Sequence, residues 1–252
     1  MNAPANQMFL SADEVLFHRM ESFHRQRVEI IASGQSPLGK RDDGFLIVHL
    51  LPHQCFKSRD RFDGATLKVH GSKLSAFGDE GRYAASRFNV DGLLNIDSER
   101  AAESYTQIFR DGRLESVMTA ITFQTNGHFA PSNQEPPKEP RYLRDGSCEQ
   151  AVFKLVKEYL SFCQGIGVPA PISMFSALVD CKGVVFYSQW GHRSGTGGID
   201  RSPAFLPDIE IGASDEEQEK LMRPWCDTLA QAMGFEKSPN YDENGNWRER
   251  RR

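Results

Sequence analysis

The sequence predicts an α+β fold, in which a mixed, largely antiparallel sheet with hairpins packs against three or more helices. Three observations lead to this prediction. Apolar residues recur at helical spacing behind capping residues in separate parts of the chain. Runs of β-prone residues flank short turns that contain glycine, which is typical of hairpins. Strands and helices do not alternate regularly, so a doubly wound nucleotide-binding sheet is not expected.

The first helix is predicted to begin after Ser11. Glu14 follows three residues later, and the two form a capping box, which satisfies free N–H groups at a helix start. Gly34 is the predicted stop. The apolar residues at helical spacing between these limits are Leu16, Met20, Phe23 and Ile30.

Several strands are predicted in the first half of the chain. Residues 44–52 (GFLIVHLLP) form a continuous apolar run that ends in proline, as in a strand buried on both faces. Residues 65–71 and 91–97 are predicted to be short strands. Residues 104–123 are predicted to form an antiparallel hairpin that turns at Asp111-Gly112, a dipeptide that tolerates positive φ.

The second half opens with another predicted helix, capped by Ser147 with Gln150 and ending near residues 165–167. Residues 171–180 and 183–190 are predicted to form a second hairpin, followed by a strand at 205–211.

A final helix is predicted after Ser214, which has Glu217 three residues later. Pro224 is expected to kink this helix or to end its first segment, because proline lacks the N–H of a helix interior.

One domain is predicted over residues 11–247, between a flexible N-terminus at 1–10 and a basic tail at 248–252. Residues 126–146 hold four prolines among polar residues and read as a long loop, the candidate for an internal boundary.

The composition indicates a soluble protein of the cytoplasm. The 252 residues carry a net charge of -4, so no overall field attracts nucleic acid or an acidic membrane. The five cysteines are widely spaced and odd in number, which argues against a disulfide framework. The N-terminal sequence does not resemble a secretory signal, and no apolar run approaches the ~20 residues that span a bilayer. No membrane association is expected.

No motif in the sequence indicates a cofactor or a metal. The glycine-rich stretch QWGHRSGTGGIDRS (residues 189–202) lacks the lysine and the following helix of a phosphate-binding loop, so we expect a mobile loop between Gly191 and Gly198. His49, His53 and Cys55 lie close in sequence, but a second pair of ligands is missing. Acidic residues between 91 and 115 leave a metal-dependent hydrolase as an alternative.

Two basic clusters are candidates for phosphate contacts. The first lies on the predicted first helix and the second in the tail, and binding through them would be weak and independent of base sequence. The candidate residues are Arg19, Arg25, Arg27, Arg248, Arg250 and Arg251.

Five segments, taken in order, resemble the C-terminal region of bacterial Schlafen AlbA-type proteins, which are often described as DNA-binding or ATP-binding. They are FHRMESFHRQRVEIIASGQSPL, GFLIVHLLP, RFNVDGLL, SYTQIFRDGRLESV and LMRPWCDTLAQAMGFEKSPNYDENGNW. The resemblance runs over most of residues 15–247. The N-terminal domain that gives the family its name has no counterpart here, so the resemblance implies the C-terminal half alone and carries over no catalytic residue. Positions that match the family, without an established role, are His49, Asn89, Asp91, Arg110, Gly112 and Glu115.

These observations favour a non-catalytic binding or scaffold domain that contacts a protein partner, in phage defence or DNA metabolism. A weak DNA- or RNA-binding module and a metal-dependent nucleic-acid hydrolase are the alternatives.

Overall fold

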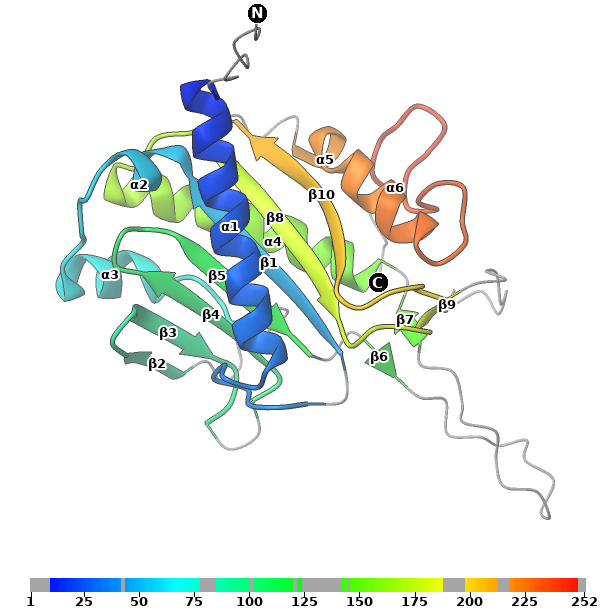
Figure 1. Cartoon of the computed structure of the whole chain (residues 1–252), viewed down its shortest axis with the longest axis horizontal. Coiled ribbons are helices and arrows are strands. Elements are labelled where there is room, and N and C mark those ends of the chain that lie inside the picture. Colours follow the sequence, from blue (N-terminus) through cyan, green and yellow to red (C-terminus); the bar gives the residue numbers. More distant parts are fainter. Residues whose placement is uncertain are drawn as a thin grey trace, which may run out of the picture.

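The chain folds around a seven-stranded antiparallel sheet that has helices on both faces, as an α+β fold (Figure 1). The computed structural model describes residues 10–41, 44–77, 85–99, 102–119, 122–123, 142–144, 146–187, 198–212 and 218–248. The order of the strands across the sheet is β10-β8-β1-β5-β4-β3-β2. Their bounds in chain order are β1 Phe45–Pro52, β2 Ala85–Phe88, β3 Gly92–Ile96, β4 Ser104–Phe109, β5 Leu114–Met118, β8 Ile172–Val179 and β10 Ala204–Ile211.

One long helix crosses the first face of the sheet, and three helices contribute to the core on the second face (Figure 1). The helix on the first face is α1 (Ala12–Ala32), and those on the second are α3 (Gly64–Gly71), α4 (Ser147–Ile166) and α6 (Arg223–Gln231). The short helix α2 (His53–Lys57) follows β1, and the short helix α5 (Gln218–Leu221) precedes α6. A small second sheet joins β6 (Thr122–Phe123), β7 (Tyr142–Arg144) and β9 (Val185–Tyr187).

The predicted start of α1 is confirmed. The Ser11 hydroxyl accepts a hydrogen bond from the Glu14 N–H at 3.2 Å, and Glu14 Oε2 accepts one from the Ser11 N–H at 2.6 Å. Gly34 follows the helix with φ +82°, as a stop requires. The buried stripe of α1 consists of Leu16, Met20, His24, Val28 and Ile31, so it carries a histidine at its centre.

β1 is the central strand that the continuous apolar run predicts. All eight of its residues are buried, because β5 and β8 flank it and helices cover both faces. Leu46, Val48 and Leu50 point to the core on the second face of the sheet, whereas Ile47 and His49 point to the first face and α1.

The hairpin at Asp111-Gly112 is confirmed, although it is shorter than predicted. The Gly112 N–H donates to the Phe109 carbonyl at 2.9 Å, and Gly112 takes φ +95°. β5 ends at Met118, and Thr122 and Phe123 pair instead with β7 in the second sheet. The predicted span of 104–123 was therefore too long at its C-terminal end.

The short strand predicted at 65–71 is wrong, because these residues form α3. Asp63 caps the helix by accepting a hydrogen bond from the Thr66 N–H at 2.7 Å. Leu67 is completely buried in the core. Cap and packing therefore override the β-preference of Thr66 and Val69.

The second predicted hairpin is also wrong. Its first strand, β8, pairs with β1 and β10, while its second strand, β9, pairs in parallel with β7. The start of α4 was misplaced by one residue, since Gly146 is its N-cap and Ser147 its first helical residue. Its predicted end is confirmed by Gly167, which has φ +71°.

The C-terminal part follows the prediction where it is described. β10 pairs with β8, and the helix is interrupted at Met222, just before Pro224 in the first turn of α6. One sheet and one core combine residues from both sides of the proposed boundary at 126–146. Predictions for residues 1–9, for residues 191–197 of the glycine-rich loop and for Ser214 and Glu217 lie outside the described residues.

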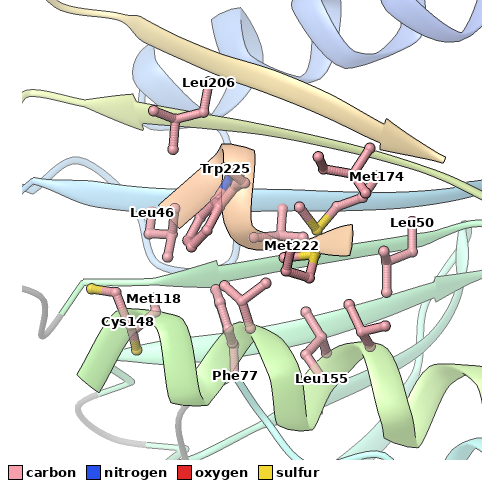
Figure 2. Packing of buried hydrophobic residues seen from close by; sticks show 14 of the residues in the cluster. Leu46, Leu50, Phe77, Met118, Cys148, Leu155, Met174, Leu206, Met222 and Trp225 are labelled. Carbon is pink, nitrogen blue, oxygen red and sulfur yellow. The ribbon is translucent and has the colours of Figure 1, made fainter. Parts of the chain in front are cut away.

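The core on the second face is built around Trp225 of α6 (Figure 2). Its indole N–H donates to the Ser176 hydroxyl of β8 at 2.6 Å, which satisfies the one polar group of a fully buried ring. Leu46 and Met222 lie on either side of the indole in Figure 2. Among the described helices, none has the length and the apolar character needed to cross a bilayer.

Candidate binding site and the buried ionic cluster beneath it

Five polar side chains meet between α1 and the sheet and form what we call the buried ionic cluster: His24, Arg27, His49, Tyr105 and Glu115. Glu115 lies at its centre. Its Oε1 accepts hydrogen bonds from Arg27 Nη2 and from the Tyr105 hydroxyl, both at 2.8 Å. Its Oε2 accepts from Arg27 Nε at 2.6 Å and contacts His49 Nε2 at 3.0 Å. All four acceptor positions of the carboxylate are therefore occupied.

The contacts of Glu115 determine the tautomers of both histidines. An ionised carboxylate only accepts hydrogen bonds, so His49 must donate through Nε2 and keeps an acceptor at Nδ1. His24 Nδ1 lies 2.7 Å from His49 Nδ1 and must be the donor of that contact. The lone pair of His24 Nε2 has no partner, and it is the one buried side-chain nitrogen or oxygen in this state within the described ranges.

The cluster perturbs the pKa values of its members. Burial raises the pKa of Glu115, but hydrogen bonds from Arg27 and His49 outweigh this effect and lower it to about 2. Burial lowers the pKa of His24 to about 2, and the neighbouring His49 and Arg25 act in the same direction. Burial also lowers the pKa of His49, against the attraction of Glu115. Near neutral pH the cluster thus holds a carboxylate, a guanidinium and two neutral imidazoles.

This arrangement supports a structural role for the cluster. Glu115 and His49 are completely buried, and the carboxylate has no acceptor position left for a substrate or a metal. The sequence pointed to Arg27, His49 and Glu115 for separate reasons, whereas it missed His24 and Tyr105. The buried stripe of α1 could have indicated His24, since it lies four residues after Met20 and four before Val28.

A hollow of about 510 Å³ lies between α1 and α2, and we call it the α1–α2 hollow. Its apolar lining consists of Leu10, Val15, Phe23 and Phe56, and its uncharged polar lining of Ser22, Gln26 and Cys55. The charged or ionisable residues that line it are His18, Arg19 and Arg113, and no acidic side chain is among its described lining residues. It combines apolar walls with basic groups.

Arginine and phenylalanine side chains connect the hollow to the buried ionic cluster. The Arg113 guanidinium lies 4.2 Å from the Phe23 ring centroid and 5.5 Å from that of Phe109. The guanidinium of Arg27, which binds Glu115, also lies 5.5 Å from the Phe109 ring centroid, so Arg27 and Arg113 share this ring. The Phe23 ring also packs edge-on against His49, with centroids 5.5 Å apart. The cluster therefore supports the floor of the hollow.

The three candidate arginines of α1 have different environments in the structure. Arg27 is bound to Glu115 and largely buried, which corrects its prediction as a surface contact for phosphate. Arg25 is paired with Glu21 at 2.9 Å and lies 4.4 Å over the Phe205 ring. Arg19 is exposed and donates to the Phe56 carbonyl at 2.7 Å.

The two basic clusters do not form one surface. Arg248 follows Trp247, whose ring packs 4.7 Å from that of Phe153 on α4, and α4 covers the face of the sheet opposite to α1. Arg250 and Arg251 lie outside the described residues.

The other family-matching positions build turns. Asn89 Oδ1 accepts from the N–H groups of Asp91 and Gly92, and Asn89 Nδ2 donates to Gln107. Arg110 donates to the carbonyls of Val90 and Asn89, which joins this turn to the β4–β5 hairpin. The Gly112 carbonyl accepts from the Tyr159 hydroxyl at 2.6 Å.

The candidate metal ligands have separate partners. His53 Nε2 contacts the Ser173 hydroxyl at 2.9 Å, and the Cys55 thiol donates to the Asp111 carbonyl at 2.9 Å. Within the described ranges, no three His, Cys, Asp or Glu side chains gather as metal ligands would. Asp97 accepts from the Glu103 N–H and from the Ser104 hydroxyl, and it follows β3, which β4 separates from the strand of Glu115.

Comparisons of the chain with protein-family models, with curated proteins and with solved structures find no match.

Proposed function

We propose that this protein is a non-catalytic binding domain and that the α1–α2 hollow is its contact surface for a protein partner. The observation that carries the proposal is the exposure of apolar side chains at this hollow. Leu10 is 54% and Val15 44% exposed, although α1 buries five other residues efficiently. Apolar side chains gathered beside a hollow and rimmed by polar residues are typical of sites where proteins associate.

The buried ionic cluster, which lies beneath the hollow, also supports this proposal. It joins α1 to the sheet and packs His49 against Phe23, so the Phe23 ring is positioned before a partner binds, which lowers the entropic cost of binding. Cys55 and Cys163 are poor candidates for a nucleophile, since burial raises the pKa of both thiols to about 12. A scaffold role beside a partner also agrees with the resemblance to the C-terminal region of Schlafen AlbA-type proteins, and phage defence or DNA metabolism in the cytoplasm is the setting we propose.

Site-specific photo-crosslinking tests the contact surface. A photoreactive phenylalanine analogue replaces Val15 in one variant and Val69 in a control, because Val69 is also exposed, at 61%, but lies on α3. We expect a partner that is crosslinked from position 15 and not from position 69. The captured protein, once purified, should bind the unmodified chain in solution, and Val15→Asp should weaken that binding at least tenfold. Equal crosslinking from both positions would refute the proposal.

The nucleic-acid alternative has weaker support, because Arg27 is bound to Glu115 and Arg25 to Glu21. A salt titration of duplex DNA binding measures it. With Arg19 as the one candidate arginine of α1 that lacks an acidic partner among the described residues, α1 should contribute about -0.9 to the slope of log K against log salt. Tight binding that survives high salt would favour this alternative instead.

A further inference from the structure

We infer that the α1–α2 hollow binds an acidic segment of a partner protein, in which a carboxylate meets Arg19 and a neighbouring aromatic side chain enters the hollow. This inference rests on the proposed function and specifies the chemistry of the partner. It is argued from the charges that line the hollow, from the way Arg19 is held and from the apolar lining.

The charges of the hollow complement an anion. Three of its lining residues are basic or can become so, and none of the described lining residues is acidic. Two of the three already face a carboxylate of this chain: Arg113 binds Asp111 at 2.6 Å, and His18 Nδ1 lies 3.8 Å from Glu21. Arg19 has no such partner among the described residues. It is the guanidinium that a carboxylate from outside can neutralise.

Arg19 is also held in place. Its Nη1 donates to the Phe56 carbonyl at 2.7 Å, and its guanidinium carbon lies 5.8 Å from the Phe56 ring centroid. One of its five N–H donors is thereby used, and four remain. A guanidinium positioned before binding suits a carboxylate, which accepts two parallel hydrogen bonds from it.

The apolar lining favours a ligand that has apolar groups beside its charge. Leu10 and Val15 are exposed at the rim, and Phe23 and Phe56 lie deeper. The hollow has a volume of about 510 Å³ and is open to solvent, so an aromatic side chain can reach its apolar lining from outside. A sugar-phosphate backbone would leave this apolar surface unused, whereas an acidic segment with aromatic residues uses both features.

Isothermal titration calorimetry with the full chain and three synthetic peptides tests the inference. The probe is GSDFDLFDGS, its charge-reversed counterpart is GSKFKLFKGS, and its counterpart without large apolar residues is GSDADAADGS. Arg19→Gln removes the proposed contact. Arg25→Gln is the matched control, because Arg25 is an exposed arginine of the same helix that already pairs with Glu21.

We expect GSDFDLFDGS to bind at least tenfold more tightly than either counterpart. Arg19→Gln should weaken its binding about 10- to 100-fold, as for the loss of hydrogen bonds to a charged group, and Arg25→Gln less than twofold. Equal binding of the three peptides, binding only of the lysine peptide, no binding at millimolar concentration, or displacement by oligothymidylate at lower concentration than by peptide would overturn the inference. If crosslinking from position 15 succeeds and the purified partner binds Arg19→Gln normally, the contact surface stands and only its acidic chemistry fails.

Discussion

Arg27 of α1 and Glu115 of β5 form a two-point ion pair that joins the helix to the middle of the sheet. The two nitrogen–oxygen distances are 2.6 and 2.8 Å, and the residues are 88 positions apart in sequence. The carboxylate is completely buried, and the arginine side chain is 19% exposed. A buried pair of this kind contributes little net stability when intact, but the loss of one partner leaves an uncompensated charge.

Glu115→Gln should therefore destabilise the protein by about 3–5 kcal/mol, because Arg27 would remain buried without its counter-charge. Denaturant unfolding followed by circular dichroism measures this change. Glu29→Gln, an exposed glutamate of α1, is the control and should change stability by less than about 0.5 kcal/mol. A variant at position 115 as stable as its control would show that Arg27 finds water or another partner.

Stability should fall as the pH is lowered from 6.5. The folded-state pKa of His24 is about 2, below the ordinary 6.5, so the unfolded chain binds more protons in this window and acid favours unfolding. For His24 alone the loss between pH 7 and pH 5 is about 2 kcal/mol. Glu115 contributes a further loss below pH 4.5, because its folded-state pKa is about 2.

Thermal unfolding over a pH series measures this dependence. His24→Gln should reduce the slope of stability against pH between 6.5 and 5 by more than His18→Gln, which removes an exposed histidine of the same helix. Identical slopes for the two variants would contradict the assignment to His24.

Gly112→Val should destabilise the fold by about 1–3 kcal/mol. Gly112 takes φ +95°, which a β-branched residue resists, and an added Cβ would lie 3.2 Å from the Phe62 ring. Gly212→Val is the control, because position 212 has ordinary φ and no atom within 4 Å of an added Cβ. Chemical denaturation of both variants makes the comparison, and a smaller loss at position 112 than at 212 would contradict it.

The native thiols should react slowly. Burial raises the pKa of Cys55 and Cys163 to about 12, and that of Cys148 well above its usual value. The thiolate is the reactive form, so these groups should react about a thousandfold more slowly than unfolded cysteine. An aromatic disulfide reagent at pH 8 should detect five thiols promptly in denaturant and almost none in native protein. One rapid equivalent from the native state would identify an exposed thiolate.

The sequence predicted those elements whose signals are local. The capping box at Ser11, the apolar run of β1 and the glycine of the β4–β5 turn act within a few residues, and all three are present in the structure. The pairing of β8 depends on β1, where Phe175 lies opposite His49, so no turn signal near residue 180 could reveal it.

The candidate site was only partly predictable for the same reason. The sequence marked Arg27 as part of a basic cluster and His49 and Glu115 as positions that match the family, but their contact exists only once α1 lies on the sheet. The α1–α2 hollow brings together residues of α1, α2 and the hairpin, and periodicity carries no information on such a meeting.

The position of β1 between β5 and β8 has a consequence for synthesis on the ribosome. His49 lies opposite Phe175, 126 residues later, so β1 emerges from the ribosome long before β8, one of its two neighbours. At ordinary translation rates that interval is roughly 6 to 25 seconds. During this time one edge of FLIVHLLP stays unpaired, and nascent chains should engage chaperones that recognise extended apolar segments until β8 arrives.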